Sequence, residues 1–401
     1  MLRVLYLVHD LSDPAVRRRV LMLQAGGAAV TLAGFRRGTN RLADLEGIEP
    51  IELGVTEDAR FAQRVFAVAR ASASLGRSLR DIVRPDVIVA RNLEMLALAD
   101  RAAARFGDVP IAYECLDVHR LLLREDGLGR AMRTAERLFG RRVALLVTSS
   151  PAFVENYFRP LSNIRAPAHL VENRVLELDG PLAATAPRAR PAGAPWRIGW
   201  FGAIRCRKSL ALLSQFTRQM EGRFEVVLRG RPAYSEFDDF DGAISREPFI
   251  RFEGPYRNPE DLAAIYADVD FSWAIDFFEE GLNSRWLLPN RLYEGCRHGA
   301  LPIVLEGTET ARMSAQRGIG VALPDIRSET LVDRLGAFDE ATYRTLSANL
   351  FGLGPRPWII DRADCVAFVE RLASLRQKDA AAAMPQPLAP FVSTRVDCHD
   401  R

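Results

Sequence analysis

Lysine is nearly absent from this sequence. Of the 54 basic residues only two are lysine, Lys208 and Lys378. The five cysteines are odd in number and form no C-x-x-C pair, which argues against a disulfide framework and a zinc knuckle and is typical of a reducing cytosol. No run approaches the ~18 apolar residues that span a bilayer, and the first residues do not resemble a signal peptide. We therefore expect a cytoplasmic protein, with any membrane contact peripheral.

Strong net charge is also lacking. The formal charge of +3 is too small to indicate nucleic acid, and we expect no such partner. Its distribution is uneven, because residues 1–176 carry 26 arginines against 20 acidic residues, whereas the rest of the chain is net negative. A basic first half is typical of either a solvated arginine-rich face or a surface that meets an anionic membrane or substrate.

Strand-like apolar runs alternate with helix-length patterns in both halves of the chain. Leu2–Val8 and Trp196–Gly202 each precede a polar loop and a helical pattern. This alternation predicts an α/β protein with two Rossmann-like, doubly wound parallel-sheet domains that face each other across a cleft. The expected segments are an N-terminal domain (1–176), a linker (177–195), a C-terminal domain (196–355), a closing helix (356–377) and a disordered tail (378–401). A further helix is expected from Asn258 to Tyr266.

The clearest local signal is the loop from Gly202 to Ser209, between a predicted strand and a helix. A glycine allows the backbone to approach a bound oxygen, and the start of a helix attracts anions through its free N–H groups. Arg205 and Lys208 add full positive charges. Because arginine dominates this sequence, a lysine here suggests a need for a compact charge, although a solvated lysine at a helix start is the alternative. The loop lacks Walker spacing, so we predict a diphosphate site of another kind.

Here the sequence resembles a GT-B-fold glycosyltransferase close to glycosyltransferase family 4, which is common in bacterial polysaccharide assembly. The family's strand-G-x-x-x-x-x-K loop is matched by Gly202 to Lys208, and its next strand, ending in glycine, by Leu228-Arg229-Gly230. A late family motif, Pro-Asn-Lys/Arg-Leu-x-Glu, is matched from Pro289 to Glu294. The resemblance implies that the donor nucleotide sugar contacts these residues: Gly202, Arg205, Lys208, Gly230, Asn290, Arg291 and Glu294. In the family, the arginine and lysine hold the diphosphate and the last glutamate binds the ribose.

The sequence departs from the family at two places. The family's first glutamate, eight positions before Glu294, is replaced by Trp286, and Glu279 and Glu280 are candidates to substitute for it. The family often places a histidine after a central strand, where this chain has Leu116. The nearby polar residues Glu114, Asp117 and His119 are therefore candidates to position the sugar or the acceptor.

The resemblance implies transfer of a sugar, with UDP-glucose as the default donor, to a lipid-linked oligosaccharide in surface or exopolysaccharide synthesis. Retention of configuration follows from the family. We expect no cofactor and no metal, because Arg205 and Lys208 would stabilise the leaving diphosphate and no D-x-D pair stands at a strand end. Two alternatives remain open: a nucleotide-sugar 2-epimerase of the same fold, and a degenerate transferase that serves as a scaffold.

Overall fold

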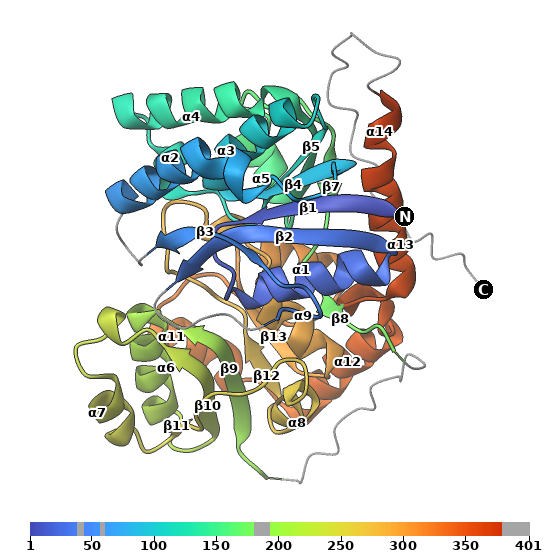
Figure 1. The fold of residues 1–401 in the computed structure, drawn as a ribbon. Helices are drawn as coiled ribbons and strands as arrows, with labels where there is room; N and C mark the ends of the chain where they lie inside the picture. The colour runs from blue at the N-terminus through green and yellow to red at the C-terminus, as the bar shows by residue number, and fades with distance from the viewer. Residues whose placement is uncertain (38–43, 57–60, 180–192, 379–401) are drawn as a thin grey trace.

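The chain folds into two parallel sheets, each covered by helices, in a computed structural model that describes residues 1–37, 44–56, 61–179 and 193–378 (Figure 1). The carboxyl ends of the two sheets face each other. Asn283 of the second half hydrogen-bonds Asp117 and Val118, which follow a strand of the first. The sheets carry the strand orders of doubly wound folds, so the predicted α/β class with two Rossmann-like halves is confirmed.

The N-terminal sheet is buried on both faces. Its strand β1 exposes only Arg3, as expected for a parallel strand between two helical layers. In sheet order the strands are β3 (Ile51–Thr56), β2 (Ala28–Arg37), β1 (Leu2–Val8), β4 (Val87–Arg91), β5 (Ile111–Cys115), β6 (Val143–Thr148) and β7 (Ala168–Leu170). One face carries α2 (Phe61–Ser78), α3 (Asn92–Arg105), η1 (Arg120–Leu123), α4 (Gly127–Phe139), η2 (Gly140–Arg142), α5 (Pro151–Phe153) and the π-helical turn η3 (Val154–Phe158).

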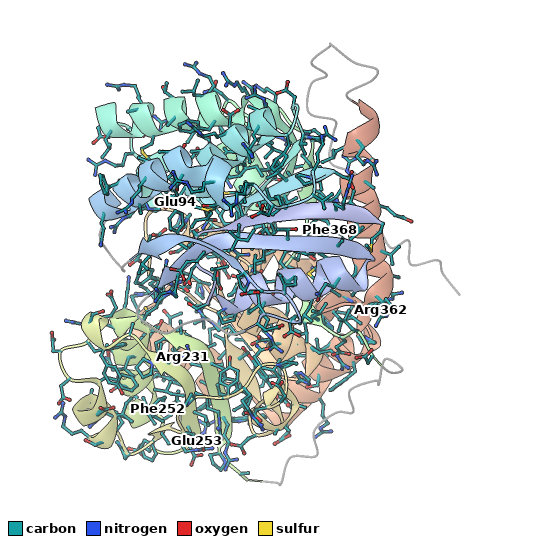
Figure 2. All side chains as sticks on the ribbon, in the orientation of Figure 1. Glu94, Arg231, Phe252, Glu253, Arg362 and Phe368 are labelled. Atoms are coloured by element: carbon teal, nitrogen blue, oxygen red, sulfur yellow. The ribbon has the colours of Figure 1, made fainter. Side chains whose placement is uncertain are left out.

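The opposite face of this sheet is covered by the two ends of the chain. Helix α1 (Pro14–Ala25) lies beside α13 (Arg362–Ala373), and Phe368 of α13 joins the apolar cluster on this face (Figure 2). A two-stranded sheet, β8 (Val175–Leu176) with β15 (Ile359–Ile360), leads into α13. The C-terminal segment therefore packs on the N-terminal half.

The C-terminal sheet has the strand order β11-β10-β9-β12-β13-β14. Its core is rich in aromatic rings around Trp196, which contacts Phe224, Phe271 and Phe338. The strands are β11 (Ile250–Phe252), β10 (Phe224–Pro232), β9 (Trp196–Ile204), β12 (Phe271–Trp273), β13 (Leu301–Leu305) and β14 (Val321–Leu323). The helices are α6 (Arg207–Gln219), η4 (Tyr234–Glu236), α7 (Phe240–Ser245), α8 (Leu262–Ala267), η5 (Ser284–Trp286), α9 (Asn290–Arg297), α10 (Glu309–Gln316), α11 (Ser328–Gly336), α12 (Glu340–Gly352) and η6 (Arg356–Trp358).

Two expectations need correction. The helix predicted to begin at Asn258 begins at Leu262, because the Asn258 side chain is bound to Glu294 instead of capping a helix. Lys378, expected in the tail, is the last residue of the short helix α14 (Leu375–Lys378). Residues 180–192 of the expected linker and 379–401 of the expected tail lie outside the described residues.

Candidate functional site

The turn between β9 and α6 lies at the centre of the C-terminal sheet. Gly202 has φ +107° and Gly230, its partner on β10, has φ +130°, both in the region that favours glycine. Helix α6 begins at Arg207, and the Cys206 sulfur accepts the Ser209 N–H. The sequence motif therefore forms the expected structure, a glycine-lined strand end that leads into a helix N-terminus.

Arg205 and Lys208 project from this turn toward the segment after β12. The Lys208 ammonium contacts the Glu280 carboxylate at 2.7 and 2.8 Å and lies 4.9 Å from the centre of the Phe277 ring. The Arg205 guanidinium lies 4.1 Å from the centre of the Phe278 ring and 3.7 Å from the Asp276 carboxylate. The structure thus brings the two cations and Glu280 together.

A cavity of about 450 Å³ is lined by Glu280, the partner of Lys208, although neither Lys208 nor Arg205 lines it. It is lined on one side by the segment after β12, including Asp276 and Glu280, and on the other by Thr308 and Thr310 after β13. Its size lies within the range of about 300–1,000 Å³ that is usual for small-molecule sites. The cavity opens at the carboxyl ends of the strands, where doubly wound sheets bind ligands.

Glu294 lies on α9 and is almost completely buried. Its carboxylate accepts hydrogen bonds from the Asn258 amide at 2.9 Å and the Tyr266 hydroxyl at 3.2 Å. Burial raises the pKa of Glu294, and these two donors together with Arg18 and Arg291 oppose the shift. Arg18 comes from α1, so Glu294 lies where the two halves meet.

The two residues at the start of α9 differ in exposure. Asn290 is exposed at the first position of the helix. Arg291 is buried and donates to the main-chain oxygen of Ile275 at 2.9 Å, with the Asp276 carboxylate at 3.5 Å. Arg291 therefore fixes the segment that carries Asp276.

Asp117 lies on the N-terminal side of the cleft. Asn283 donates to its carboxylate at 2.6 Å. Asp117 is exposed as a residue, and Asn283 covers part of its carboxylate. This partial burial, followed by the nearby charge of Glu279, raises the pKa of Asp117 to about 7, against the opposing effect of Arg205.

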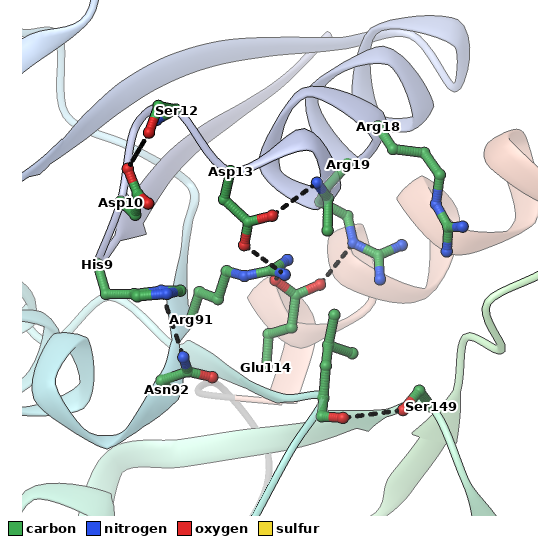
Figure 3. Close-up of polar contacts among 12 residues, drawn as sticks. His9, Asp10, Ser12, Asp13, Arg18, Arg19, Arg91, Asn92, Glu114 and Ser149 are labelled. Atoms are coloured by element: carbon green, nitrogen blue, oxygen red, sulfur yellow. Dashed lines mark hydrogen bonds and ion pairs between the residues drawn. The ribbon is translucent and has the colours of Figure 1, made fainter. Parts of the chain in front are cut away.

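Glu114 does not fit the role expected for it. Its carboxylate is fully buried and is bound by Arg19 at 2.5 Å (Figure 3). Tyr6 at 2.6 Å and Arg91 at 3.2 Å bind it as well. Burial alone would raise the pKa of Glu114, but the two arginines outweigh it and lower the pKa to about 2. With both oxygens engaged inside the N-terminal half, Glu114 stabilises the fold and does not face a ligand.

His119 also has a local role. Its Nδ1 accepts the Leu121 N–H at 3.3 Å and caps the short helix η1. Three residues that the sequence did not single out contribute to the site: Asp276, Asn283 and Arg18. Asp276 and Asn283 lie in the same segment as Glu280, which the sequence did single out.

No protein-family model matches the chain. The succinoglycan biosynthesis protein ExoL of Rhizobium meliloti (strain 1021) is 62% identical to it over 379 residues, which cover 94% of each chain. The chain belongs to the ExoL family.

Solved structures place this ExoL-family chain among GT-B folds. A sucrose-phosphate synthase from Thermosynechococcus elongatus matches 95% of this chain and 100% of its own, with a TM-score of 0.72 at 13% identity. Anabaena HepE in complex with UDP and glucose matches 93% of this chain and 100% of its own, with a TM-score of 0.66 at 12% identity. A glycosyltransferase from Rickettsia africae matches 94% and 99%, with a TM-score of 0.65 at 12% identity. The GT-B fold expected from the sequence is confirmed.

Two further findings concern the described residues alone. They contain no cluster of three or more histidine, cysteine, aspartate or glutamate side chains arranged to hold a metal ion. They also contain no helix long and apolar enough to cross a bilayer.

Proposed function

We propose that this chain is a glycosyltransferase of exopolysaccharide assembly that transfers a sugar from a nucleoside diphosphate to a lipid-linked oligosaccharide. The observation that carries the proposal is the pair Arg205 and Lys208 at the mouth of the C-terminal sheet. Two comparisons support it: ExoL is named for succinoglycan biosynthesis, and HepE structures hold UDP, glucose and UDP-glucose. UDP is therefore the first nucleotide to test.

The donor diphosphate would replace the carboxylates of Asp276 and Glu280, which now contact Arg205 and Lys208. Lys208 and Glu280 are both about half exposed, and such an ion pair is worth at most about 1 kcal/mol. A diphosphate that meets Lys208, Arg205 and the N-terminus of α6 gains more, because several donors converge on it. Released Glu280 would then accept hydrogen bonds from sugar hydroxyls.

The same cations would stabilise the charge that develops as the sugar leaves. The bond between the anomeric carbon and the β-phosphate oxygen breaks, and the acceptor oxygen bonds that carbon from the same face. The acceptor's proton passes to the departing phosphate oxygen, which yields the nucleoside diphosphate and a retained linkage. Positive charge from Arg205, Lys208 and α6 takes the place of a divalent cation, so we expect no metal requirement and no cofactor.

Other residues of the site would hold the rest of the donor. Glu294 would exchange its bonds to Asn258 and Tyr266 for bonds to the ribose hydroxyls. Gly202 and Gly230 leave space for the nucleotide at the strand ends, and Asn290 is exposed at the start of α9. Asp117, beside Asn283, would position the transferred sugar or the acceptor.

The proposal is tested by calorimetric titration of UDP, GDP and ADP, followed by transfer from labelled UDP-glucose to membranes of a Rhizobium meliloti strain that lacks ExoL. We expect UDP to bind and label to enter the lipid fraction equally with and without EDTA. Conversion of the nucleotide sugar to its C2 epimer without acceptor would identify an epimerase. Binding of none of the three nucleotides would identify a scaffold. Loss of transfer in EDTA would refute metal independence.

We also propose that this enzyme acts in the cytoplasm at the inner face of the membrane, through the helical layer of α2, α3 and α4 (Figure 1). The outer faces of these helices carry six exposed arginines that form no ion pair within the described part of the chain. They are Arg70, Arg77, Arg101, Arg105, Arg130 and Arg137. Helix α2 contains no acidic residue, and the one acidic residue of α4, Glu136, is buried.

Exposed apolar side chains accompany these arginines. Phe66 is 69% exposed, Leu138 54% and Leu128 45%. Basic helices that also expose phenylalanine and leucine are typical of interfaces with anionic lipids, where each basic residue contributes about 1 kcal/mol. We expect the protein to sediment with phosphatidylglycerol vesicles but not with phosphatidylcholine vesicles. Replacing Arg130 and Arg137 by glutamate should abolish sedimentation, and the same change at the control residues Arg334 and Arg344 should not.

A further inference from the structure

Helix α1 carries three arginines in succession, Arg17, Arg18 and Arg19. Neighbouring residues of a helix point about 100° apart, so the three side chains meet different surroundings. Arg17 is exposed and pairs with Glu46, whereas Arg19 is buried and binds Glu114 at 2.5 Å (Figure 3). Arg18 is half-buried and forms no ion pair within the residues that the structure describes.

Neutral groups hold Arg18 at the junction of the two halves. Its Nη2 lies 3.4 Å from the main-chain oxygen of Glu172 and 3.4 Å from the Asn173 Oδ1. The amide nitrogen of Asn173 donates in turn to the main-chain oxygen of Leu288 at 2.9 Å. Leu288 precedes α9, the helix that carries Glu294. A single asparagine therefore links α1 of the N-terminal half to the segment that leads into α9.

The guanidinium of Arg18 is close enough to Glu294 for the two charges to interact. Burial, followed by the like charge of Arg19, lowers the pKa of Arg18 to about 10, while Glu294 opposes the shift. Arg91 adds to the shift and Glu114 opposes it, each less strongly than Glu294. Arg18 therefore keeps its positive charge at neutral pH. Its hydrogen bonds of 3.4 Å to neutral oxygens are long, so Glu294 is its main counter-charge.

The groups around Glu294 come from both halves of the molecule. They are Asn258, Tyr256, Tyr266 and Arg291 of the C-terminal half and Arg18 of the N-terminal half. Both tyrosines are neutral, because burial raises the pKa of each far above its usual value. Arg291 is already engaged with the main-chain oxygen of Ile275 and with Asp276. Of the two cations, Arg18 is therefore the one without an ion pair in the described part of the chain.

We propose that Arg18 is a positioning residue of the donor site, because it supplies from the N-terminal half the counter-charge for a Glu294 carboxylate that binds the ribose. The inference rests on the proposed function and deepens it, since donor binding then depends on contact between the two halves. An ionised carboxylate accepts hydrogen bonds at both oxygens, whereas a protonated one donates from one of them. Burial disfavours the ionised form of Glu294, and Arg18 favours it.

Calorimetric titration with UDP and with 2′,3′-dideoxy-UDP separates this role from a direct contact with phosphate. The two probes carry the same diphosphate and differ only in the ribose hydroxyls. Arg18→Met removes the charge and should weaken UDP binding about tenfold, but leave the affinity for dideoxy-UDP within about twofold. Arg18→Lys should restore most of the affinity for UDP. Equal losses for the two nucleotides would overturn the proposal and place Arg18 on the phosphate.

The pH profile of UDP binding is a readout that a merely structural role would not move. Because Arg18 favours the ionised form of Glu294, Arg18→Met should raise the pH below which the affinity for UDP falls, relative to dideoxy-UDP. Arg18→Lys should return the profile toward that of the unmodified protein. Arg17→Met is the matched control, since it removes an exposed arginine of the same helix whose partner is Glu46. It should change neither affinity nor pH profile, and a profile unmoved by Arg18→Met would contradict the proposal.

Urea unfolding tests the pair of charges without any nucleotide. The effect of Arg18→Met is compared in the unmodified protein and in Glu294→Gln. Attraction between the two charges is present only in the unmodified protein, so Arg18→Met should lower the urea midpoint more there than in Glu294→Gln. Equal shifts in the two backgrounds would overturn the counter-charge role even if UDP binds normally. Unequal shifts in a protein that binds no nucleotide would instead refute the proposed function, and the donor role of Arg18 with it.

Discussion

Asn283 and Asp117 join the two halves of the molecule by a hydrogen bond of 2.6 Å across the cleft. Asn283 makes a second bond, of 2.7 Å, to the main-chain oxygen of Val118. The Asn283 side chain is fully buried. Asp117, by contrast, shares its surroundings with two more carboxylates, Glu279 and Asp276, whose negative charges oppose its ionisation. The contact across the cleft therefore places acidic groups of both halves close together.

Burial of Asp117, together with this crowding, predicts a pH-dependent stability. The pKa of Asp117 is raised to about 7, so the folded state holds a proton that the unfolded state releases near pH 4. Asp117 therefore lowers the free energy of unfolding progressively as pH rises from about 4 to about 7. In Asp117→Asn, which keeps the acceptor oxygen for Asn283, this loss is absent. The difference in Tm between variant and unmodified protein should grow across that interval, as measured by thermal unfolding. A difference that is constant with pH would contradict the assignment.

Lys208 should affect transfer and leave the fold intact. Lys208→Ala removes the positive charge that would stabilise the leaving diphosphate. Loss of one such stabilising group typically lowers kcat about a hundredfold or more. The Tm should hardly change, because the bond from Lys208 to Glu280 is half exposed. Lys208→Arg should restore only part of the activity, since a planar fork replaces a compact charge.

The matched control is Arg218→Ala, near the end of the same helix. It removes an exposed side chain whose partner is Glu247, far from the turn. Its kinetics should be those of the unmodified protein. Near-normal transfer by Lys208→Ala would contradict the proposal that Lys208 binds the donor diphosphate.

The fold and the donor turn were predictable because their signals are local. Alternating strand and helix patterns define both sheets, and glycine with Arg205 and Lys208 lies within one short loop. The run after residue 305 has weaker patterns, and its helices α10, α11 and α12 were not predicted. Local signals fail where packing against distant segments decides the structure.

Glu114 illustrates such a failure. From the sequence it is a polar residue at a strand end, as a ligand-binding residue would be. Its partner Arg19 lies 95 residues away in the chain, and only the folded arrangement shows that the pair is buried. Asp276 and Asn283 were missed for another reason. They lie in an irregular segment whose path no periodic pattern specifies.

Glu114→Gln should destabilise the protein strongly. Removal of the carboxylate leaves Arg19 buried without a counter-charge and leaves Arg91 with Asp13 alone, which costs about 3–5 kcal/mol. Because the pKa of Glu114 is lowered to about 2, its stabilising contribution is complete above about pH 4 and is lost as pH falls toward 2. Urea unfolding at pH 7 measures the first effect. Tyr6→Phe, which removes one bond to the same carboxylate, should cost only about 1–3 kcal/mol. Equal urea midpoints of unfolding for Glu114→Gln and the unmodified protein would show that the contacts of Glu114 do not stabilise the fold.

Gly230→Ala should damage the donor turn through backbone contact. A Cβ at Gly230 would lie 1.9 Å from the Gly202 carbonyl oxygen, and its φ of +130° disfavours any side chain. Strands β9 and β10 would have to separate at their carboxyl ends, so we expect a loss of more than about 2 kcal/mol in the free energy of unfolding and weaker UDP binding. Gly254→Ala is the matched control, since it has φ +78° but no neighbouring atom within 4 Å. Gly254→Ala should lower the free energy of unfolding by only about 1–2 kcal/mol, the cost of a positive φ in a residue other than glycine. It should leave the affinity for UDP unchanged. Equal effects of the two substitutions on UDP titration would show that the approach of Gly230 to Gly202 does not shape the donor site.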